Sequence, residues 1–519
     1  MNWNDECDVL VVGSGAGGCT GAYTAAREGL STILVEATDR VGGIAAYSGG
    51  GGMWFPCNAA LRRSGDADTI EDALTYYRAV VGERTPADLQ ETYVRSGAPL
   101  IDYLEEDDDL EFVAFPWPDY YGKLPKARAT GRHITAKPMP ASAIGELRYS
   151  LRPWLGTDWL GQPMPDDLVG GQALIGRFLL AMSKLPALRT ELNSPCEELV
   201  LDDGVVVGAI VVVGAIVVRE GRRVAIRARM GVLIASGGFE RNDAMRTKYG
   251  VPGVARDSMA PAGNQGKAIT AGIAVGADTD LMDQAWWSPG LTHPEGNSAF
   301  ALWFTGGLFV NNAGQRFVNE SAAYDRLGRD IIRELEQGRV TLPYWMVYDD
   351  RDGLAPPVKA TNVPMVAAEK YVDAGLWKTA DTLEELAELI AVPAQALVGT
   401  VARFNGFVET GVDEDFGRGD EAYDRAFSGG EPPLYPITKG PFHAAAFGIS
   451  DLGTKGGLRT NTDGQVLDTE GSRIPGLYAA GNSMAAPSGA TYPGGGNPIG
   501  TSMVFSHLAV RDMIRRRVG

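Results

Sequence analysis

The chain has 519 residues, of which 45% are hydrophobic and 22% are charged. This length and composition predict a globular protein of two or more domains. The 65 acidic and 47 basic residues give a formal net charge of −18, which argues against a surface for nucleic acid or an anionic membrane. We therefore expect a small-molecule partner.

Cysteine usage and hydropathy indicate a protein of the reducing cytoplasm. Cys7, Cys19, Cys57 and Cys196 lack the paired spacing of a zinc site and suggest no disulfide framework, so no metal is expected. The first residues are acidic and lead directly into an apolar strand, so we expect no export signal. The longest apolar run, residues 205–218, is shorter than the ~18–20 residues of a transmembrane helix. It contains the hexamer VVVGAI twice and is interpreted as two strands of a lengthened hairpin.

Residues 8–36 have the pattern of a strand, a glycine turn, a helix and a second strand. Gly13, Gly15 and Gly18 stand at the spacing GxGxxG between the first strand and the helix. The first glycine makes the turn, the second admits a pyrophosphate, and the third lets the helix and strand pack closely. The helix N-terminus offers amide donors to phosphates, and Glu36 is placed to accept hydrogen bonds from a ribose. The sequence therefore predicts a dinucleotide site.

The segments that follow Glu36 favour FAD over NAD. Gly42 and Gly43 precede a loop of small residues, 47–52, which lets the backbone approach a flat ring system. A strand and turn, GLYAAGN at residues 476–482, resembles a further phosphate-side element of FAD proteins. We therefore assign FAD as the cofactor.

Strands from both ends of the chain are predicted to build one domain of α/β class. This Rossmann-like FAD-binding domain would consist of residues 1–284 and 448–519, with a further strand and turn at GVLIASGGFE, 231–240. Between them, aromatic-rich short strands, isolated helices and proline-rich loops predict an inserted α+β catalytic domain, residues 285–447. The acidic stretches 105–109 and 412–415 are expected to be solvated surface.

Tyrosines are the candidate acid–base groups, because an enzyme that removes hydride from an unactivated carbon must also remove a proton. Tyr120 and Tyr121 stand in PWPDYYGK, Tyr324 in RFVNESAAYDRLGR, and Tyr492 just before a glycine run in SGATYPGGGNPIGT. We expect surface or packing roles for the four histidines, His133, His293, His443 and His507.

These tyrosine segments, with GGFE, DQAWWSPG, DLGTKGGL and GLYAAGN, resemble the active-site segments of the 3-ketosteroid Δ1-dehydrogenases. That family belongs to the fumarate reductase and succinate dehydrogenase flavoprotein superfamily, and the similarity runs from residue 3 to the end. The resemblance implies flavin-dependent 1,2-dehydrogenation of a 3-ketosteroid in steroid catabolism, with a quinone-like or artificial electron acceptor that the sequence does not identify. The loop after Gly43 contains no histidine, so FAD is expected to be bound non-covalently.

The resemblance also implies roles for individual residues. Tyr492 and the backbone amide of Gly496 would hold the C3 carbonyl and stabilise the enolate that develops there. Tyr324 would abstract the C2 proton with support from Tyr120, and hydride from C1 would pass to flavin N5. The expected steroid-lining residues are Trp117 and Phe300, and the expected FAD contacts are Gly13, Ser14, Gly15, Ala16, Gly17, Gly18, Glu36, Ala37, Gly42, Gly43, Ser48, Gly49, Ser236, Gly237, Gly481, Asn482, Pro498 and Ile499.

Two positions depart from the family pattern, and three alternatives stay open. Gly495 stands where many members have proline, and Lys267 where an acidic residue is frequent. A fumarate-reductase-like enzyme would hold a dicarboxylate with arginines. Three arginines flank the segment of Tyr324, although they fit surface charges equally well, namely Arg316, Arg326 and Arg329. A Δ4-ketosteroid dehydrogenase would act on an adjacent ring position. A flavin-binding protein with only a structural or regulatory role would not turn over substrate with an artificial electron acceptor.

Overall fold

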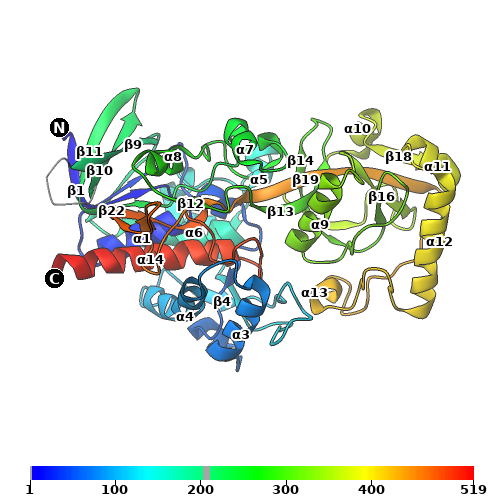
Figure 1. The fold of residues 1–519 in the computed structure, drawn as a ribbon, viewed down its shortest axis with the longest axis horizontal. Helices are drawn as coiled ribbons and strands as arrows, with labels where there is room; N and C mark the ends of the chain where they lie inside the picture. The colour runs from blue at the N-terminus through cyan, green and yellow to red at the C-terminus, as the bar shows by residue number, and fades with distance from the viewer. Residues whose placement is uncertain (1–2, 203–210, 519) are drawn as a thin grey trace.

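The structure is a computed structural model that describes residues 3–202 and 211–518. Figure 1 shows two sheet regions at the two ends of the long axis, with strand β19 (Phe442–Thr454) running between them. The chain termini lie together at the end that carries β1 (Asp5–Val12). The predicted α/β fold class is confirmed.

The first sheet has eight strands, and its centre is parallel. Strand β1 pairs in parallel with β11 (Arg222–Ile234) on one side and with β2 (Thr32–Val35) on the other. In spatial order the main path is β21 (Gln465–Leu467), β22 (Arg473–Ala479), β11, β1, β2 and β8 (Leu188–Glu191). The predicted strands near both chain ends thus lie in one sheet, because β22 pairs with β11.

An antiparallel hairpin extends this sheet beside β11. Strand β10 (Val211–Arg219) pairs with β11 and with β9 (Cys196–Asp202). The second copy of the hexamer VVVGAI begins β10, whereas the first copy, 205–210, lies outside the described residues.

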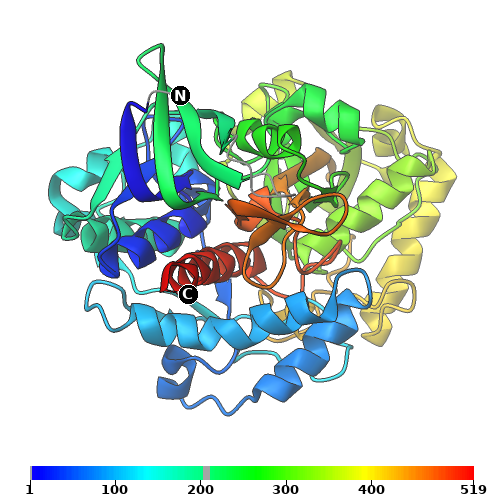
Figure 2. The ribbon, with the colours of Figure 1, turned by 60° about the vertical axis from the view of Figure 1, so that its left-hand side comes forward.

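Helices α1 (Ala16–Arg27) and α14 (Asn497–Val518) pack against each other beside the first sheet. A Cβ atom on Gly17 would lie 2.2 Å from the Ser502 hydroxyl oxygen, so the glycine lets the two helices approach closely. Figure 2 shows α14 between the sheet and the helix pair α3 (Ile70–Val81) and α4 (Ala87–Leu104). Helix α6 (Gly170–Ser183) also packs on α1.

The second sheet has seven strands, and all its pairings are antiparallel. In spatial order the main path is β15 (Leu308–Val310), β16 (Tyr344–Asp349), β19, β13 (Ala285–Thr292), β14 (Ser298–Phe304) and β17 (Val358–Thr361), and β18 (Trp377–Ala380) also pairs with β19. Helix α9 (Tyr324–Glu336) packs on β13. Strand β19 remains paired with β13 as far as Thr454, beyond the predicted boundary at residue 447.

Shorter elements complete the fold. A small sheet contains β3 (Met53–Trp54), β5 (His133–Ala136) and β4 (Phe112–Ala114). The other α-helices are α2 (Ala59–Arg63), α5 (Leu155–Leu160), α7 (Asp243–Tyr249), α8 (Lys267–Ala274), α10 (Ala368–Asp373), α11 (Leu383–Leu389), α12 (Ala394–Thr410) and α13 (Ala422–Arg425).

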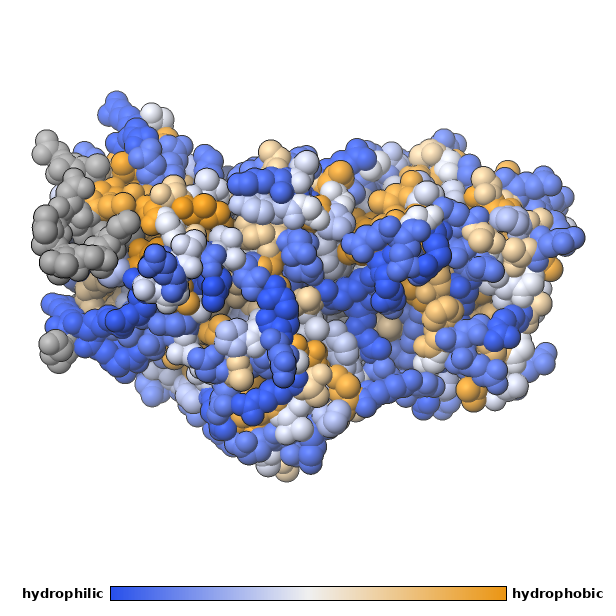
Figure 3. All heavy atoms as spheres, viewed as in Figure 1, coloured by the Kyte–Doolittle hydropathy of each residue, from blue (hydrophilic) through white to orange (hydrophobic). Residues whose placement is uncertain are grey.

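The face of the molecule in Figure 3 is mostly hydrophilic, and its hydrophobic residues lie in separate groups. Within residues 3–202 and 211–518, no helix combines the length and the apolar character that a bilayer crossing requires. In the same part of the chain, no group of histidine, cysteine, aspartate and glutamate side chains could hold a metal ion.

Candidate active site

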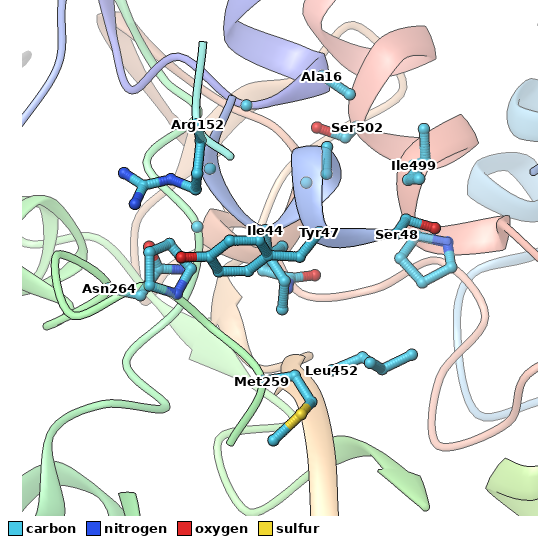
Figure 4. Close-up of a pocket in the computed structure, with 18 of the residues that line it drawn as sticks. Ala16, Ile44, Tyr47, Ser48, Arg152, Met259, Asn264, Leu452, Ile499 and Ser502 are labelled. Atoms are coloured by element: carbon cyan, nitrogen blue, oxygen red, sulfur yellow. The ribbon is translucent and has the colours of Figure 1, made fainter. Parts of the chain in front are cut away.

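Residues from both sheet regions line one cavity of about 670 Å³. The turn after β1 lines it, and so do Phe300 of β14 and Tyr324 of α9. In Figure 4, Ala16 and Ile499 lie on one side of this pocket, and Met259 and Leu452 on the other. Most of the predicted FAD contacts line it, namely Gly13, Ser14, Gly15, Ala16, Glu36, Ala37, Gly43, Ser48, Gly49, Ser236, Gly237, Gly481, Asn482, Pro498 and Ile499.

The other three predicted FAD contacts, Gly17, Gly18 and Gly42, do not line the cavity. A Cβ atom on Gly18 would lie 1.8 Å from the Gly13 carbonyl oxygen, so this glycine allows helix and strand to meet. Gly17 faces α14, and the Gly42 amide donates to the Ser14 hydroxyl at 3.2 Å. These glycines shape the turn through packing.

The glycine turn leaves room and donors for an anionic group. Gly13 has a left-handed φ of 98°, and a Cβ atom there would lie 2.5 Å from the Ala235 carbonyl oxygen. At Gly15, by contrast, a Cβ atom would meet nothing within 4 Å, so the backbone borders open space. Helix α1 begins at Ala16 without a side-chain cap, and its first amides are available to a phosphate.

Glu36 is buried and holds the turn together. Its carboxylate accepts hydrogen bonds from the Ser14 amide at 3.1 Å and the Ser14 hydroxyl at 2.5 Å. The other carboxylate oxygen accepts from the amide and hydroxyl of Thr38, both at 2.9 Å. Glu36 therefore organises the loop in addition to lying where a ribose was predicted.

Arg152 is a lining residue that the sequence did not reveal. Its Nη2 donates to the Thr38 hydroxyl at 2.7 Å, and its guanidinium lies 5.7 Å from the centroid of the Tyr47 ring. The Nε donor is buried and has no hydrogen-bond partner among the described residues. Figure 4 shows this side chain beside Tyr47. A buried cation with an unused donor suits a phosphate or ribose oxygen.

The residues at this end of the cavity fit FAD. The open space at Gly15, the uncapped start of α1, the Glu36 carboxylate and the unused Arg152 donor supply what a dinucleotide requires. Gly49 also lines the cavity, and a Cβ atom there would meet nothing within 4 Å.

Three tyrosines from separate segments meet at the other end of the cavity. Tyr324 is the first residue of α9, and Tyr492 precedes α14. The Tyr120 amide donates to the Pro493 carbonyl at 3.0 Å, which fixes the segment of Tyr120 beside that of Tyr492. The ring centroids are 5.4 Å apart for Tyr120 and Tyr324, 5.1 Å for Tyr120 and Tyr492, and 5.6 Å for Tyr324 and Tyr492, all edge to face. Tyr121 does not line the cavity.

Two hydrogen-bond donors, the Tyr492 hydroxyl and the Gly496 amide, lie side by side. The Gly496 amide donates to the Tyr492 hydroxyl oxygen at 3.2 Å, and Gly496 has a left-handed φ of 81°. A Cβ atom on Gly496 would lie 1.7 Å from the Gly52 carbonyl oxygen, so only glycine fits. The Tyr492 hydroxyl keeps its own proton for an acceptor in the cavity.

Burial raises the pKa of each of the three tyrosines. The pKa of Tyr324 is held well above 10 by desolvation first and then by the neighbouring Tyr120 and Tyr492. Desolvation likewise raises the pKa values of Tyr120 and Tyr492 above the ordinary value. The three side chains are therefore neutral phenols at neutral pH.

Apolar side chains complete this end of the cavity. The Phe300 ring lies edge to face with Tyr324, with centroids 4.9 Å apart, and the Trp117 ring stacks on Phe115 at 5.0 Å. A Cβ atom on Gly495 would lie 3.0 Å from Trp117 Nε1 and 3.1 Å from the Tyr120 hydroxyl. Gly495 is thus closely covered, and a larger residue there requires a small shift of Trp117 or Tyr120.

Lys267 and the four histidines are the other polar residues considered from the sequence, and none of them is in ring contact with the three tyrosines. Lys267 lines the cavity as the first residue of α8, and its Nζ lies 3.7 Å from a Glu197 carboxylate oxygen. None of the four histidines lines the cavity, and three of them, His133, His293 and His443, are buried packing residues.

The three arginines near the predicted base are bound in ion pairs outside the cavity. Arg316 is buried and pairs with Glu320 and Asp413, each at 2.8 Å. Of the two readings that the sequence left open for Arg316, a surface charge is therefore excluded, and the expectation that the whole stretch 412–415 is solvated is wrong at the buried Asp413. Arg326 pairs with Glu421, and Arg329 with Asp325, each at 2.8 Å.

Comparison with known proteins identifies the family. The model of the FAD binding domain family matches residues 8–499. A 3-oxosteroid 1-dehydrogenase of Mycolicibacterium smegmatis is 36% identical, and the match covers 98% of this chain and 97% of that protein. The chain belongs to the FAD-binding family of the 3-oxosteroid 1-dehydrogenases. The predicted membership, the FAD cofactor and the class of oxidoreductase are thereby confirmed.

Two further similarities bear on the fold and on the range of substrates. The crystal structure of the 3-ketosteroid Δ1-dehydrogenase from Sterolibacterium denitrificans, in complex with 1,4-androstadiene-3,17-dione, matches with a TM-score of 0.88. The two sequences are 29% identical, and the match covers 99% of this chain and 100% of that one. A 4-oxocyclohex-2-ene-1-carboxylate 5-dehydrogenase of Sinomonas cyclohexanicum is 32% identical over 99% of this chain and 95% of that protein.

Proposed function

We propose that this member of the family catalyses the 1,2-dehydrogenation of 3-ketosteroids in steroid catabolism. The observation that carries the proposal is the convergence of three buried tyrosines and a glycine amide at one end of a cavity whose other end fits FAD. FAD, when bound, supplies the acceptor for a hydride from C1. The protein's own residues must then hold the ketone and remove the C2 proton.

Tyr492 and Gly496 are the proposed holders of the C3 carbonyl. Their hydroxyl and amide lie 3.2 Å apart, so a ketone oxygen that replaces the Tyr492 hydroxyl as acceptor of the Gly496 amide can accept from both. Negative charge develops on this oxygen as the C2 proton leaves, and both donors stabilise it beside the buried rings of Tyr120 and Tyr324.

Tyr324 is the proposed base for the C2 proton, and Tyr120 supports it through their edge-to-face contact. Because the pKa of Tyr324 is raised, only a small fraction is ionised at neutral pH. The proton leaves C2 as the hydride leaves C1, so two hydrogens and one electron pair are removed and a C1–C2 double bond remains.

The lining of the cavity favours an uncharged polycyclic ketone over a carboxylate. Among the described residues, the only lysine and arginine that line the cavity are Lys267 and Arg152, and both lie with the predicted nucleotide contacts. The arginines flanking Tyr324 are bound in ion pairs. The aromatic walls at Trp117 and Phe300 suit an apolar ring system.

Several features complete the proposal. FAD is held non-covalently, in keeping with a cavity that no histidine of the described residues lines. The reduced enzyme passes electrons to a quinone-like acceptor or an artificial dye.

The proposed domains are residues 1–284 with 448–519, for FAD, and 285–447, for the substrate. A cytoplasmic location is proposed because all four cysteines are free.

Flavin reduction tests the proposed function. Under anaerobic conditions, 4-androstene-3,17-dione should bleach the yellow protein, and steady-state turnover should follow when an artificial electron acceptor is added. Succinate and 4-oxocyclohex-2-ene-1-carboxylate, the compound in the name of the Sinomonas cyclohexanicum relative, serve as carboxylate comparisons. Equal or faster reduction by either carboxylate would contradict the proposal and favour the corresponding rival activity.

A further inference from the structure

Lys455 is a lysine with no exposed surface, and it directly follows β19. Its Nζ donates to the carbonyl oxygens of Ala490 and Thr491, at 3.1 and 3.0 Å. Thr491 is the residue before Tyr492, so both contacts fall on the backbone that presents the tyrosine.

The burial of Lys455 is not explained by an ion pair. Its only hydrogen-bond acceptors within the described part of the chain are those two carbonyls. Asp325, the acid that acts on it electrostatically, is bound to Arg329 at 2.8 Å. Desolvation accordingly holds the pKa of Lys455 well below its ordinary value. Burial of an amine in such a place lowers the stability of the fold unless its hydrogen bonds stabilise the structure in return.

A second contact connects Lys455 to the same tyrosine. Its Nζ lies 3.8 Å from the centroid of the Trp286 ring, and the centroids of Trp286 and Tyr492 are 4.9 Å apart. Trp286 is itself fixed, because its Nε1 donates to Asn482 Oδ1 at 3.0 Å. Lys455 therefore supports Tyr492 in two ways, through the backbone of Ala490 and Thr491 and through the ring of Trp286.

The segment that carries Tyr492 needs such support. Gly489 precedes it and Gly496 follows it, and both have left-handed φ angles. A loop this rich in glycine has many accessible conformations, whereas the hydroxyl of an oxyanion donor must be placed closely.

We propose that Lys455 is a positioning residue that aims the Tyr492 hydroxyl at the substrate carbonyl. Lys455 does not line the cavity, so it acts through Tyr492 and Trp286 and not by touching the substrate. This inference rests on the proposed function, in which Tyr492 is a donor to the C3 carbonyl.

A double-mutant cycle separates this role from a general effect on folding. Lys455→Met keeps most of the side-chain length and an apolar contact with Trp286 but removes the Nζ donor and both of its hydrogen bonds. With 4-androstene-3,17-dione as substrate, it should lower kcat by roughly 10- to 10²-fold, the scale for a misplaced catalytic group. In the Tyr492→Phe background the same substitution should change kcat less than about twofold, because the hydroxyl to be positioned is already absent.

The controls distinguish the possible failures. FAD content and the affinity for the steroid should be retained, and Lys184→Met, at an exposed lysine, should leave kcat unchanged. If Lys455→Met does not retain FAD, the cycle is run with Lys455→Gln, whose amide can still donate to one carbonyl. An unchanged kcat, or an equal loss in both backgrounds, would overturn the positioning role. An unmodified protein that does not turn over the steroid would instead refute the proposed function, and this role with it.

Discussion

Replacement of Tyr492 by phenylalanine should separate catalysis from folding. The substitution removes one oxygen atom and keeps the ring, so the contacts with Tyr120, Tyr324 and Trp286 at 5.1, 5.6 and 4.9 Å are retained. Among residues 3–202 and 211–518, the hydrogen bond that the Tyr492 hydroxyl makes in the resting structure, and that phenylalanine loses, is the one accepted from the Gly496 amide, at 3.2 Å. A bond of this kind contributes about 0.5–1.5 kcal/mol to the free energy of unfolding.

The expected loss in the transition state is larger. An oxyanion donor in a site without water is worth roughly 2.7–4 kcal/mol, or 10²–10³ in kcat. Because Gly496 still donates, Tyr492→Phe should retain some turnover and should not abolish it. A loss of transition-state stabilisation that exceeds the loss in the free energy of unfolding indicates a group that acts mainly when charge develops on the substrate oxygen.

Three measurements test the prediction for Tyr492. Steady-state turnover of 4-androstene-3,17-dione with an artificial acceptor gives kcat, thermal unfolding gives the stability, and steroid-induced changes in the flavin spectrum give the affinity. We expect a large fall in kcat with a small fall in stability. Turnover within about threefold of the unmodified protein would refute the donor role, and a stability loss above roughly 3 kcal/mol would show that the hydroxyl serves the fold.

Three further predictions concern the base and the cofactor. In deuterated water without an electron acceptor, the unmodified protein should exchange the C2 hydrogen of the steroid. Tyr324→Phe should lose this exchange and turnover while it keeps FAD. Near-normal exchange by Tyr324→Phe would move the role of base to Tyr120. Because burial raises the pKa of Tyr324 above 10 and the ionised form is the base, kcat/KM should rise with pH through the range 7 to 9.5, and a plateau below pH 8 would contradict this assignment. Acid precipitation should release all of the flavin as FAD, whereas yellow colour in the pellet would indicate a covalent bond.

Local sequence patterns were enough to predict that the glycine turn and Glu36 lie close together, and Gly13, Gly15 and Glu36 all line the cavity. Gly13, Gly15 and Glu36 lie within one strand–turn–helix–strand unit, so their spacing alone brings them to one edge of a sheet. The pattern did not show that Glu36 is held by Ser14 and Thr38, because hydroxyl donors leave no periodic signal.

Residues that act through distant partners could not be predicted from spacing. Arg152 reaches Thr38 across 114 positions, and nothing in its own neighbourhood marks it as a cavity residue. Arg316 was equally compatible with a surface charge, since its partner Asp413 lies far along the chain. The grouping of Tyr120, Tyr324 and Tyr492 was predicted from the resemblance to a family and not from a pattern of residues. Their segments come from three separate parts of the fold, so no local spacing relates them.

The burial that makes these tyrosines poor acids in the resting site is also what suits them to this reaction. A neutral, buried phenol carries no charge that must be stabilised before substrate arrives, so the burial of Tyr324 and Tyr492 costs the folded protein less than the burial of ionised groups would. When the C2 proton leaves, negative charge is shared between the base and the substrate oxygen, and the low dielectric strengthens each hydrogen bond to it. An exposed tyrosine would ionise more readily but would stabilise the developing enolate less, because water would compete for the same oxygen. The closely packed rings thus keep the ionised fraction of the base small but allow strong stabilisation of the transition state by the Gly496 amide and the Tyr492 hydroxyl.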